Sequence, residues 1–231
     1  MTHAHTDLSY ERELDQIRDH VNAMGVEVCS MLTGALRALS PGEHETARGI
    51  VVADKIVNRY EVEIDEMCLT ILARRQPVAS DLRFIATALK VDTDLERIGD
   101  LCVNLCERIL QLRGAVDAES GARLGEMGAR VRSMIETALR AFATRDVALA
   151  ESVLVADDLV DKAYADASEA AAGGIRQDPT FVQDGLRLRS MAKYIERMGD
   201  HATNLAEMVI FMVDGRDVRH AGRLEERRPV N

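Results

Sequence analysis

The feature that most constrains this chain is an internal repeat with a spacing of one hundred residues. Residues 96–100 read Glu-Arg-Ile-Gly-Asp, and residues 196–200 read Glu-Arg-Met-Gly-Asp. An apolar stripe with alternating spacings of three and four residues runs through both copies in the same register. The first stripe is Ala88, Val91, Leu95, Ile98, Cys102, Leu105, Ile109 and Leu112, and the second is Leu188, Met191, Ile195, Met198, Ala202, Leu205, Val209 and Met212. Because the stripe and the polar motif repeat together, we predict two copies of one helical unit.

Turn-forming residues divide the chain into six long segments with a helical pattern. The clearest breaks include Ser40-Pro41-Gly42 and the stretch from Gly173-Gly174 to Asp178-Pro179. The six segments lie near residues 7–39, 43–75, 78–113, 119–144, 146–173 and 180–213. All six are long for helices of a globular protein, which indicates packing as bundles.

Taken with the repeat, these segments predict an all-α fold of two tandem three-helix bundles related by a pseudo-twofold axis. The first bundle is predicted at residues 1–115 and the second at residues 116–215. Residues 216–231 are predicted to form a charged C-terminal tail.

Composition and charge argue against several classes of protein. The net charge of -10 argues against non-specific binding of nucleic acid, which requires a basic surface. No uncharged apolar stretch reaches the roughly 18 residues that indicate a membrane span. Neither of the common glycine-rich phosphate-binding motifs occurs, so the sequence shows no direct phosphate site and no organic cofactor. The N-terminus has no signal-peptide pattern and the four cysteines have no disulfide spacing, so we expect a cytoplasmic protein.

Carboxylates in the repeated motif are predicted to form two clusters. Glu96 and Asp100 are four residues apart, so they share one face of a helix, away from the apolar stripe. Antiparallel pairing of the second segment with the third, and of the fifth with the sixth, brings further oxygen-bearing side chains to the same level. The first quartet is Asp54, Asn58, Glu96 and Asp100, and the second quartet is Asp157, Asp161, Glu196 and Asp200.

Clustered carboxylates repel one another, so each quartet needs a neutralising partner. One possibility is ordinary surface ion pairing with Arg97 or Arg197 and with Lys55 or Lys162. The other is a cation: all-oxygen ligation suits magnesium, calcium, manganese or iron, and zinc is also possible. Glu61 and Asp65 form an additional acidic pair, and His201 is either a helper ligand or an ordinary histidine at the edge of the core.

At these residues the chain resembles the PhoU family of phosphate-uptake regulators. The resemblance covers nearly the whole chain and rests on residues 94–100, 195–207 and 209–213, on residues 72–83, and on residues 215–220. It implies two three-helix bundles with metal clusters on (E/D)xxxD motifs, which fall on the Glu96, Asp157, Glu196 and Glu61 pairs. Asp54 is followed by Asn58, which departs from that motif and puts full metal occupancy of the first quartet in doubt.

The same resemblance implies a regulatory role without catalysis. Such a protein couples a phosphate ABC transporter ATPase to a sensor histidine kinase and represses the phosphate-starvation response when phosphate is plentiful. It is expected to be a homodimer located at the inner membrane through its partners. Two alternatives stay open: a carboxylate-bridged metal oxidase, which would need Glu-x-x-His motifs that accompany neither quartet, and a metal-free helical adaptor.

Overall fold

Six long helices and one short 3-10 helix make up the described part of this protein in a computed structural model. The structure describes residues 2–77, 79–114 and 116–218, so most of the tail predicted at residues 216–231 lies outside the described residues. The elements are α1 (Thr2–Arg37), α2 (His44–Arg75), α3 (Ala79–Leu110), α4 (Ala118–Thr144), α5 (Val147–Gln177), η1 (Pro179–Phe181) and α6 (Val182–Asp214). The described residues contain no strand, which confirms the predicted all-α class.

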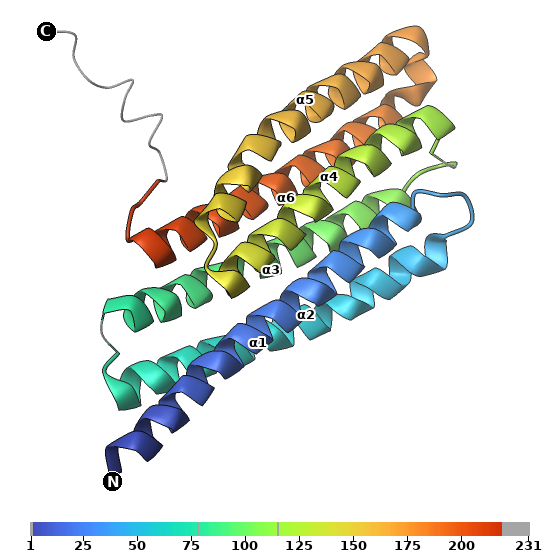
Figure 1. Cartoon of the computed structure of the whole chain (residues 1–231). Helices are drawn as coiled ribbons and strands as arrows, with labels where there is room; N and C mark the ends of the chain where they lie inside the picture. The colour runs from blue at the N-terminus through green and yellow to red at the C-terminus, as the bar shows by residue number, and fades with distance from the viewer. Residues whose placement is uncertain (1, 78, 115, 219–231) are drawn as a thin grey trace, which may run out of the picture.

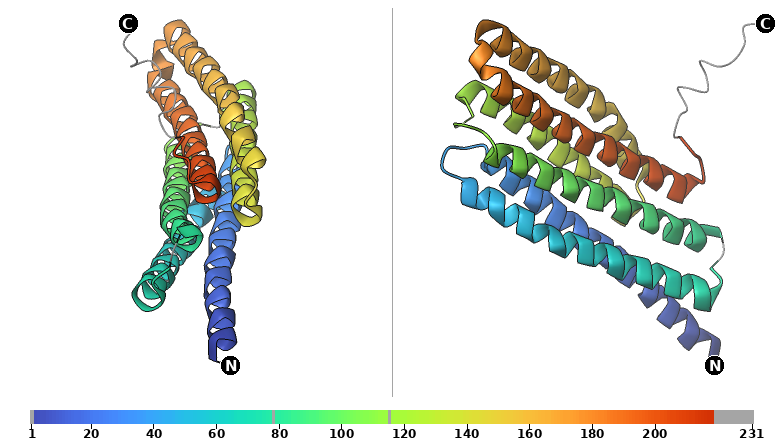
Figure 2. Two further views of the ribbon diagram at one scale, coloured as in Figure 1. Left: turned by 60° about the vertical axis from the view of Figure 1, so that its left-hand side comes forward. Right: turned by 180° about the vertical axis from the view of Figure 1, so that it is seen from behind.

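The helices form a row of four with a pair across one face (Figure 1). In the row, α2 packs on α3, α3 on α6, and α6 on α5; α1 packs on α2, α3 and α4, while α4 packs on α1, α5 and α6. Figure 2 (right) shows α2, α3 and α6 toward the viewer, with α1 and α4 behind them. Within the described ranges, no helix is both long and apolar enough to cross a membrane.

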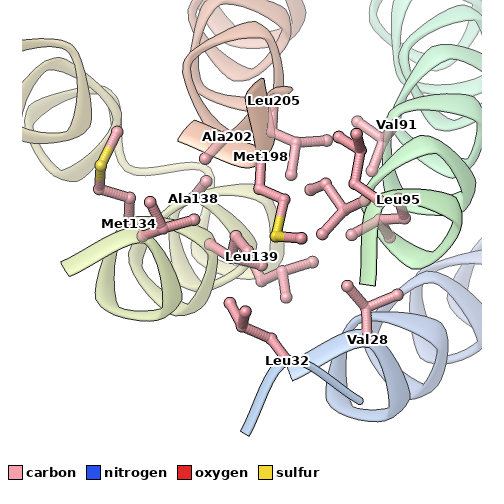
Figure 3. Packing of buried hydrophobic residues seen from close by; sticks show 14 of the residues in the cluster. Val28, Leu32, Val91, Leu95, Met134, Ala138, Leu139, Met198, Ala202 and Leu205 are labelled. Atoms are coloured by element: carbon pink, nitrogen blue, oxygen red, sulfur yellow. The ribbon is translucent and has the colours of Figure 1, made fainter. Parts of the chain in front are cut away.

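The two halves share one continuous core where α1, α3, α4 and α6 meet. Both predicted stripes are buried along α3 and α6, apart from Leu112, which follows the end of α3. Figure 3 shows buried side chains from all four helices there: Val28, Leu32, Val91, Leu95, Met134, Ala138, Leu139, Met198, Ala202 and Leu205. Burial of these stripes is the main favourable term for a bundle of this kind.

A pair of reciprocal contacts between α1 and α4 shows the pseudo-twofold symmetry directly. A Cβ atom added at Gly25 would stand 2.3 Å from Leu139 Cδ1, and one added at Gly128 would stand 2.3 Å from Leu36 Cδ2. Gly25 and Leu36 of α1 correspond to Gly128 and Leu139 of α4, which follow 103 residues later, so the two contacts are equivalent. Each glycine therefore accepts a leucine side chain from the other half, so the predicted internal repeat is confirmed.

One predicted boundary differs from the structure. The glycines at residues 173 and 174 were expected to end the fifth helix, yet α5 continues to Gln177. A Cβ atom at Gly174 would stand 2.9 Å from Phe181 Cε1, and one at Gly185 would stand 2.6 Å from Ile175 Cγ1. Gly174 is therefore a packing residue in the α5–α6 turn, and the tertiary contact outweighs the cost of about 1 kcal/mol for a helical glycine. Asp146 begins α5 by accepting a hydrogen bond from Leu149 N at 3.1 Å.

The reciprocal glycine contacts generate a stability prediction. Gly25→Ala and Gly128→Ala should each lower the free energy of unfolding by about 1–3 kcal/mol, because the new methyl group overlaps a packed leucine. Gly125→Ala is the matched control, since Gly125 also lies in α4 but has nothing within 4 Å of an added Cβ atom. That variant should gain up to about 1 kcal/mol from helix propensity. Urea unfolding followed by circular dichroism measures all three, and equal gains would contradict the packing assignment.

Candidate functional site

The first quartet lies where α2 packs against α3. Asp54 and Asp100 interact electrostatically, and Glu96 interacts with both of them, so these three carboxyl groups lie close together as predicted. Asn58 Nδ2 donates a hydrogen bond to Asp54 Oδ2 at 2.9 Å. Burial raises the pKa of Asp54, and the Asn58 hydrogen bond opposes that shift. Burial, followed by repulsion from Asp100, also raises the pKa of Glu96.

The second quartet lies at the equivalent place between α5 and α6 and carries more negative charge. Burial raises the pKa of Asp157 to about 6, and Asp161, Asp200 and Glu196 all add to that shift. Burial also raises the pKa of Asp200, and Glu196 contributes repulsion. All four predicted members of this quartet therefore interact through their charges. Half-buried carboxyl groups with raised pKa values are typical of sites that bind a cation or a proton.

Gly99 and Gly199 allow the close helix packing that creates both quartets. A Cβ atom at Gly99 would stand 3.3 Å from Val57 Cγ1 and 3.4 Å from Asp54 Oδ1. At Gly199 the corresponding distances are 3.4 Å to Val160 Cγ1 and 3.6 Å to Asp157 Oδ1. The repeated glycine therefore admits the neighbouring helix together with its aspartate.

Protein cations neutralise each quartet only in part. In the first quartet Arg97 lies 3.5 Å from Glu96 Oε2 and 3.5 Å from Asp100 Oδ2. In the second quartet Lys193 Nζ contacts Glu196 Oε1 at 2.5 Å, whereas the predicted partners were Arg197 and Lys162. One buried oxygen in each quartet still has no hydrogen-bond partner, and these two oxygens are Asp54 Oδ1 and Glu196 Oε2. Exposed ion pairs contribute at most about 1 kcal/mol each, so Arg97 does not compensate fully for its cluster.

A cation fits the donor chemistry of the quartets, although the side chains do not form a cage. Carboxylate and amide oxygens are ligands for hard cations, and an unpartnered buried oxygen gains most from one. Across the part of the chain that the structure describes, no three His, Cys, Asp or Glu side chains converge closely enough to hold a metal ion. Ligation would therefore require these side chains to turn toward one another.

His201 has a partner in the other half of the molecule. Its Nδ1 atom lies 2.7 Å from Asp94 Oδ1, and Asn204 Nδ2 donates to the same oxygen at 3.2 Å. This network joins α3 to α6 at the centre of the row. His201 is therefore engaged in packing the halves together, which is the second of the two roles left open by the sequence.

Sequence reasoning missed a buried acid next to the Glu61 and Asp65 pair. Asp92 is 0% exposed, interacts with both of those carboxyl groups, and has no hydrogen-bond partner for Oδ2. Its pKa is raised to about 8, mainly by burial. The sequence signal for this residue was its position directly after Val91, which belongs to the apolar stripe of α3. The second half has no such triad, because the equivalent positions hold Tyr164, Ser168 and Ala192.

The chain was compared with known protein families and with curated proteins. The family described as "PhoU domain" matches residues 21–109 and 124–209, which is one match in each half. A Pseudomonas aeruginosa protein named "Phosphate-specific transport system accessory protein PhoU homolog" is 39% identical over 223 residues, covering 96% of this chain and 92% of that protein. The Escherichia coli protein named "Phosphate-specific transport system accessory protein PhoU" is 33% identical over 218 residues, covering 94% of this chain and 90% of that protein.

Solved structures are similar over nearly all of the chain. The crystal structure of PhoU from Pseudomonas aeruginosa matches with a TM-score of 0.86 and 37% identity, covering 90% of this chain and 100% of that one. The phosphate transport system regulatory protein PhoU from Streptococcus pneumoniae matches with a TM-score of 0.83 and 27% identity, covering 90% and 99%. The two-bundle arrangement is therefore shared by these proteins.

Asp92 generates a prediction about the pH dependence of stability. Because its pKa is higher in the folded protein than the value of about 3.9 in the unfolded chain, its protonated form favours folding. That contribution is complete below about pH 4 and is lost as pH rises toward 8, with a slope of at most about 1.4 kcal/mol per pH unit. Asp92→Ala, which copies Ala192, and Asp92→Asn should flatten this decline. Urea unfolding of chelator-treated protein between pH 5 and 9 tests it; parallel curves for wild type and variants would refute the assignment.

Proposed function

Because the chain belongs to the PhoU family, we propose that it is an accessory protein of a phosphate-specific transport system that represses phosphate uptake and the phosphate-starvation response. The observation that carries this proposal is the match over both repeats and nearly the full length of the relatives. A role in the phosphate system follows from the relatives' names. The direction of regulation and the adaptor mechanism are the further steps that we propose.

The adaptor role is supported by the long helices and by what they present on their surfaces. On α2, Val52 is 64% exposed and Ile56 is 36% exposed. At the repeat-equivalent positions of α5, Val155 is 74% exposed and Leu159 is 54% exposed. Exposed apolar side chains next to charged rows are suited to binding another protein. We propose that such surfaces serve homodimer formation and the docking of a transporter ATPase and a sensor histidine kinase at the inner face of the membrane.

A regulator without catalytic activity accounts for the site better than an oxidase does. A carboxylate-bridged oxidase places its ligands, including Glu-x-x-His motifs, inside a four-helix bundle. Here the shared interior of α1, α3, α4 and α6 is filled with apolar side chains. The quartets lie at the outer helix pairs instead, and His201 is engaged with Asp94.

We also propose that the quartets bind cations such as magnesium, calcium, manganese, iron or zinc. Asp54, Glu96 and Asp100 would hold a cation between α2 and α3, with Asn58 as a neutral donor. Asp157, Asp161, Glu196 and Asp200 would hold one between α5 and α6. The cation would supply positive charge to the unpartnered oxygens and link each outer helix to its neighbour. Glu61 and Asp65 would extend the first quartet along α2. A metal-free adaptor remains the alternative, which elemental analysis of protein purified without chelator distinguishes.

The difference between the quartets generates a prediction for metal affinity. The second quartet has four carboxylates and should bind a divalent cation more tightly than the first, which has three and Asn58. Asp200→Ala should therefore lower the bound metal more than Asn58→Ala does, with helicity retained because both side chains are outside the core. Asn58→Asp should strengthen the first site. Titration with manganese, read by calorimetry, tests this order; unchanged binding in Asp200→Ala and in Asn58→Asp would exclude the quartets as ligands.

The regulatory proposal predicts the phenotype of a strain that lacks this chain. Such a strain should express phosphate-starvation genes even in phosphate-rich medium, and the wild-type gene should restore repression. A reporter for a starvation-induced phosphatase measures this response, with an empty vector as control. Normal repression in the deletion strain would remove the regulatory role and leave only the structural relationship.

A further inference from the structure

A groove on the face formed by α1, α4 and the start of α2 combines two arginines with three hydroxyl groups. Its volume is about 540 Å³, which is within the range of small-molecule sites. Arg37 and Arg132 contribute positive charge, and Ser30, Thr33 and Thr46 contribute hydroxyl groups. The remaining wall consists of Val26, Cys29, Gly34 and Ile50. The lining residues include no carboxylate, and Glu43 and Glu136 lie beside the groove, where they contact Arg37 and Arg132.

Two other grooves of the described structure differ in this respect. The groove between α1 and α2, of about 430 Å³, is lined by Glu13, Glu63 and Glu66. The groove between α4 and α5, of about 290 Å³, is lined by Glu126 and Asp166 together with basic residues. The α1–α4 groove therefore has the electrostatic character that suits an anion.

The guanidinium groups of this groove keep most of their donors available. Arg132 Nη1 lies 3.4 Å from Glu136 Oε1 on the same helix, which is a long contact between partly exposed groups. Arg37 Nε lies 3.4 Å from Glu43 Oε2, and Arg37 Nη2 donates to Thr46 Oγ1 at 2.9 Å. Surface pairs of this kind are weak, so an incoming anion can displace Glu43 and Glu136. Thr33 donates its hydroxyl hydrogen to Cys29 O at 2.8 Å, which leaves the two arginines and Ser30 as the donors.

The N-terminus of α2 adds to this positive character. Thr46 belongs to the first helical turn and donates a hydrogen bond to Glu43 Oε2 at 2.5 Å, but Glu43 at the N-cap position accepts none from a backbone N–H of the helix. Backbone N–H groups at an uncapped helix N-terminus favour a nearby anion. The helix N-terminus therefore adds to the positive potential that Arg37 and Arg132 supply.

Divergence between the repeats indicates that the two threonines of the groove have no counterpart in the second half. Arg140 is the repeat equivalent of Arg37, so one basic residue is kept. Thr33 and Thr46, however, correspond to Glu136 and Leu149. An acidic and an apolar residue there would oppose an anion, so the second half lacks the lining that defines the groove.

We propose that the α1–α4 groove binds a phosphoryl group, either as inorganic phosphate or as the phosphate monoester of a small molecule. Two guanidinium groups bind the dianion through charge-assisted hydrogen bonds, and the apolar wall accommodates an organic portion. Motif searching of the sequence does not reveal the site, because its residues come from three helices. The inference goes beyond the proposed function, which requires no phosphate ligand on this chain.

The test is calorimetric titration of the purified full-length chain after chelator treatment and dialysis, at constant ionic strength. Removing divalent cations ensures that binding does not occur through metal at the acidic quartets. The probes are inorganic phosphate, adenosine monophosphate, and adenosine as the uncharged control. We expect saturable binding of at least one phosphorylated probe and none of adenosine. Arg37→Gln and Arg132→Gln should each weaken binding by about tenfold or more, since both side chains donate to the anion.

Arg140→Gln is the matched control, because it removes the equivalent exposed arginine outside the groove; its affinity should equal that of wild type. If inorganic phosphate and adenosine monophosphate both bind, the phosphoryl group alone is the ligand. If adenosine monophosphate binds and inorganic phosphate does not, the ligand is a phosphate monoester. The proposal is overturned if neither phosphorylated probe binds at concentrations up to about 10 mM, a level that detects even weak sites. It is also overturned if adenosine binds equally, or if Arg37→Gln and Arg132→Gln bind as wild type does. None of these outcomes bears on phosphate regulation in cells, so the two proposals can fail independently.

Discussion

Close approach of helices at four glycines is the constraint on which the structure depends. Gly25 and Gly128 bring α1 and α4 together across the two halves, and Gly99 and Gly199 bring α2 and α5 onto the central pair. An interior packed at near-crystalline density transmits such contacts along whole helices, so the register of each pair is fixed. That register decides which polar residues stand level with one another. The acidic quartets are therefore a consequence of helix packing rather than of an independent loop or turn.

The same packing makes the quartets unfavourable unless they are neutralised. Close contact removes water from Asp54 and Asp157 while it places other carboxyl groups beside them, and both effects oppose ionisation. The two quartets reduce this repulsion in different ways. The first has the neutral Asn58 and an ion pair with Arg97, and the second has an ion pair with Lys193. One buried oxygen is left without a hydrogen-bond partner in each quartet despite these differences. The proposed cation would supply the missing partner in both repeats.

Much of the fold could be predicted because regular helices translate sequence spacing directly into position. The apolar stripes of α3 and α6 and the levels of Asp54 with Asp100 followed from helical periodicity and short turns. The end of α5 did not, because Gly174 is retained in the helix by its contact with Phe181, which local propensity does not register. Asp92 was missed because an acidic residue beside an apolar stripe is expected on the surface. Its burial depends on how α2 covers α3, which is a tertiary property.

Comparison of the repeats separates what the fold requires from what each half has acquired. The glycines and the quartet positions are retained in both, so they belong to the common packing unit. Asp92, Thr33 and Thr46 occur in the first half alone, where the second half has Ala192, Glu136 and Leu149. If packing alone determined the residue at position 92, we would expect an apolar or neutral residue there, as at Ala192 in the second half. A buried acid without a full set of partners instead carries a cost in stability, and such costs are concentrated at functional sites. The first half therefore differs from the common packing unit at Asp92 and at the two threonines of the groove, while the second half retains the more acidic quartet.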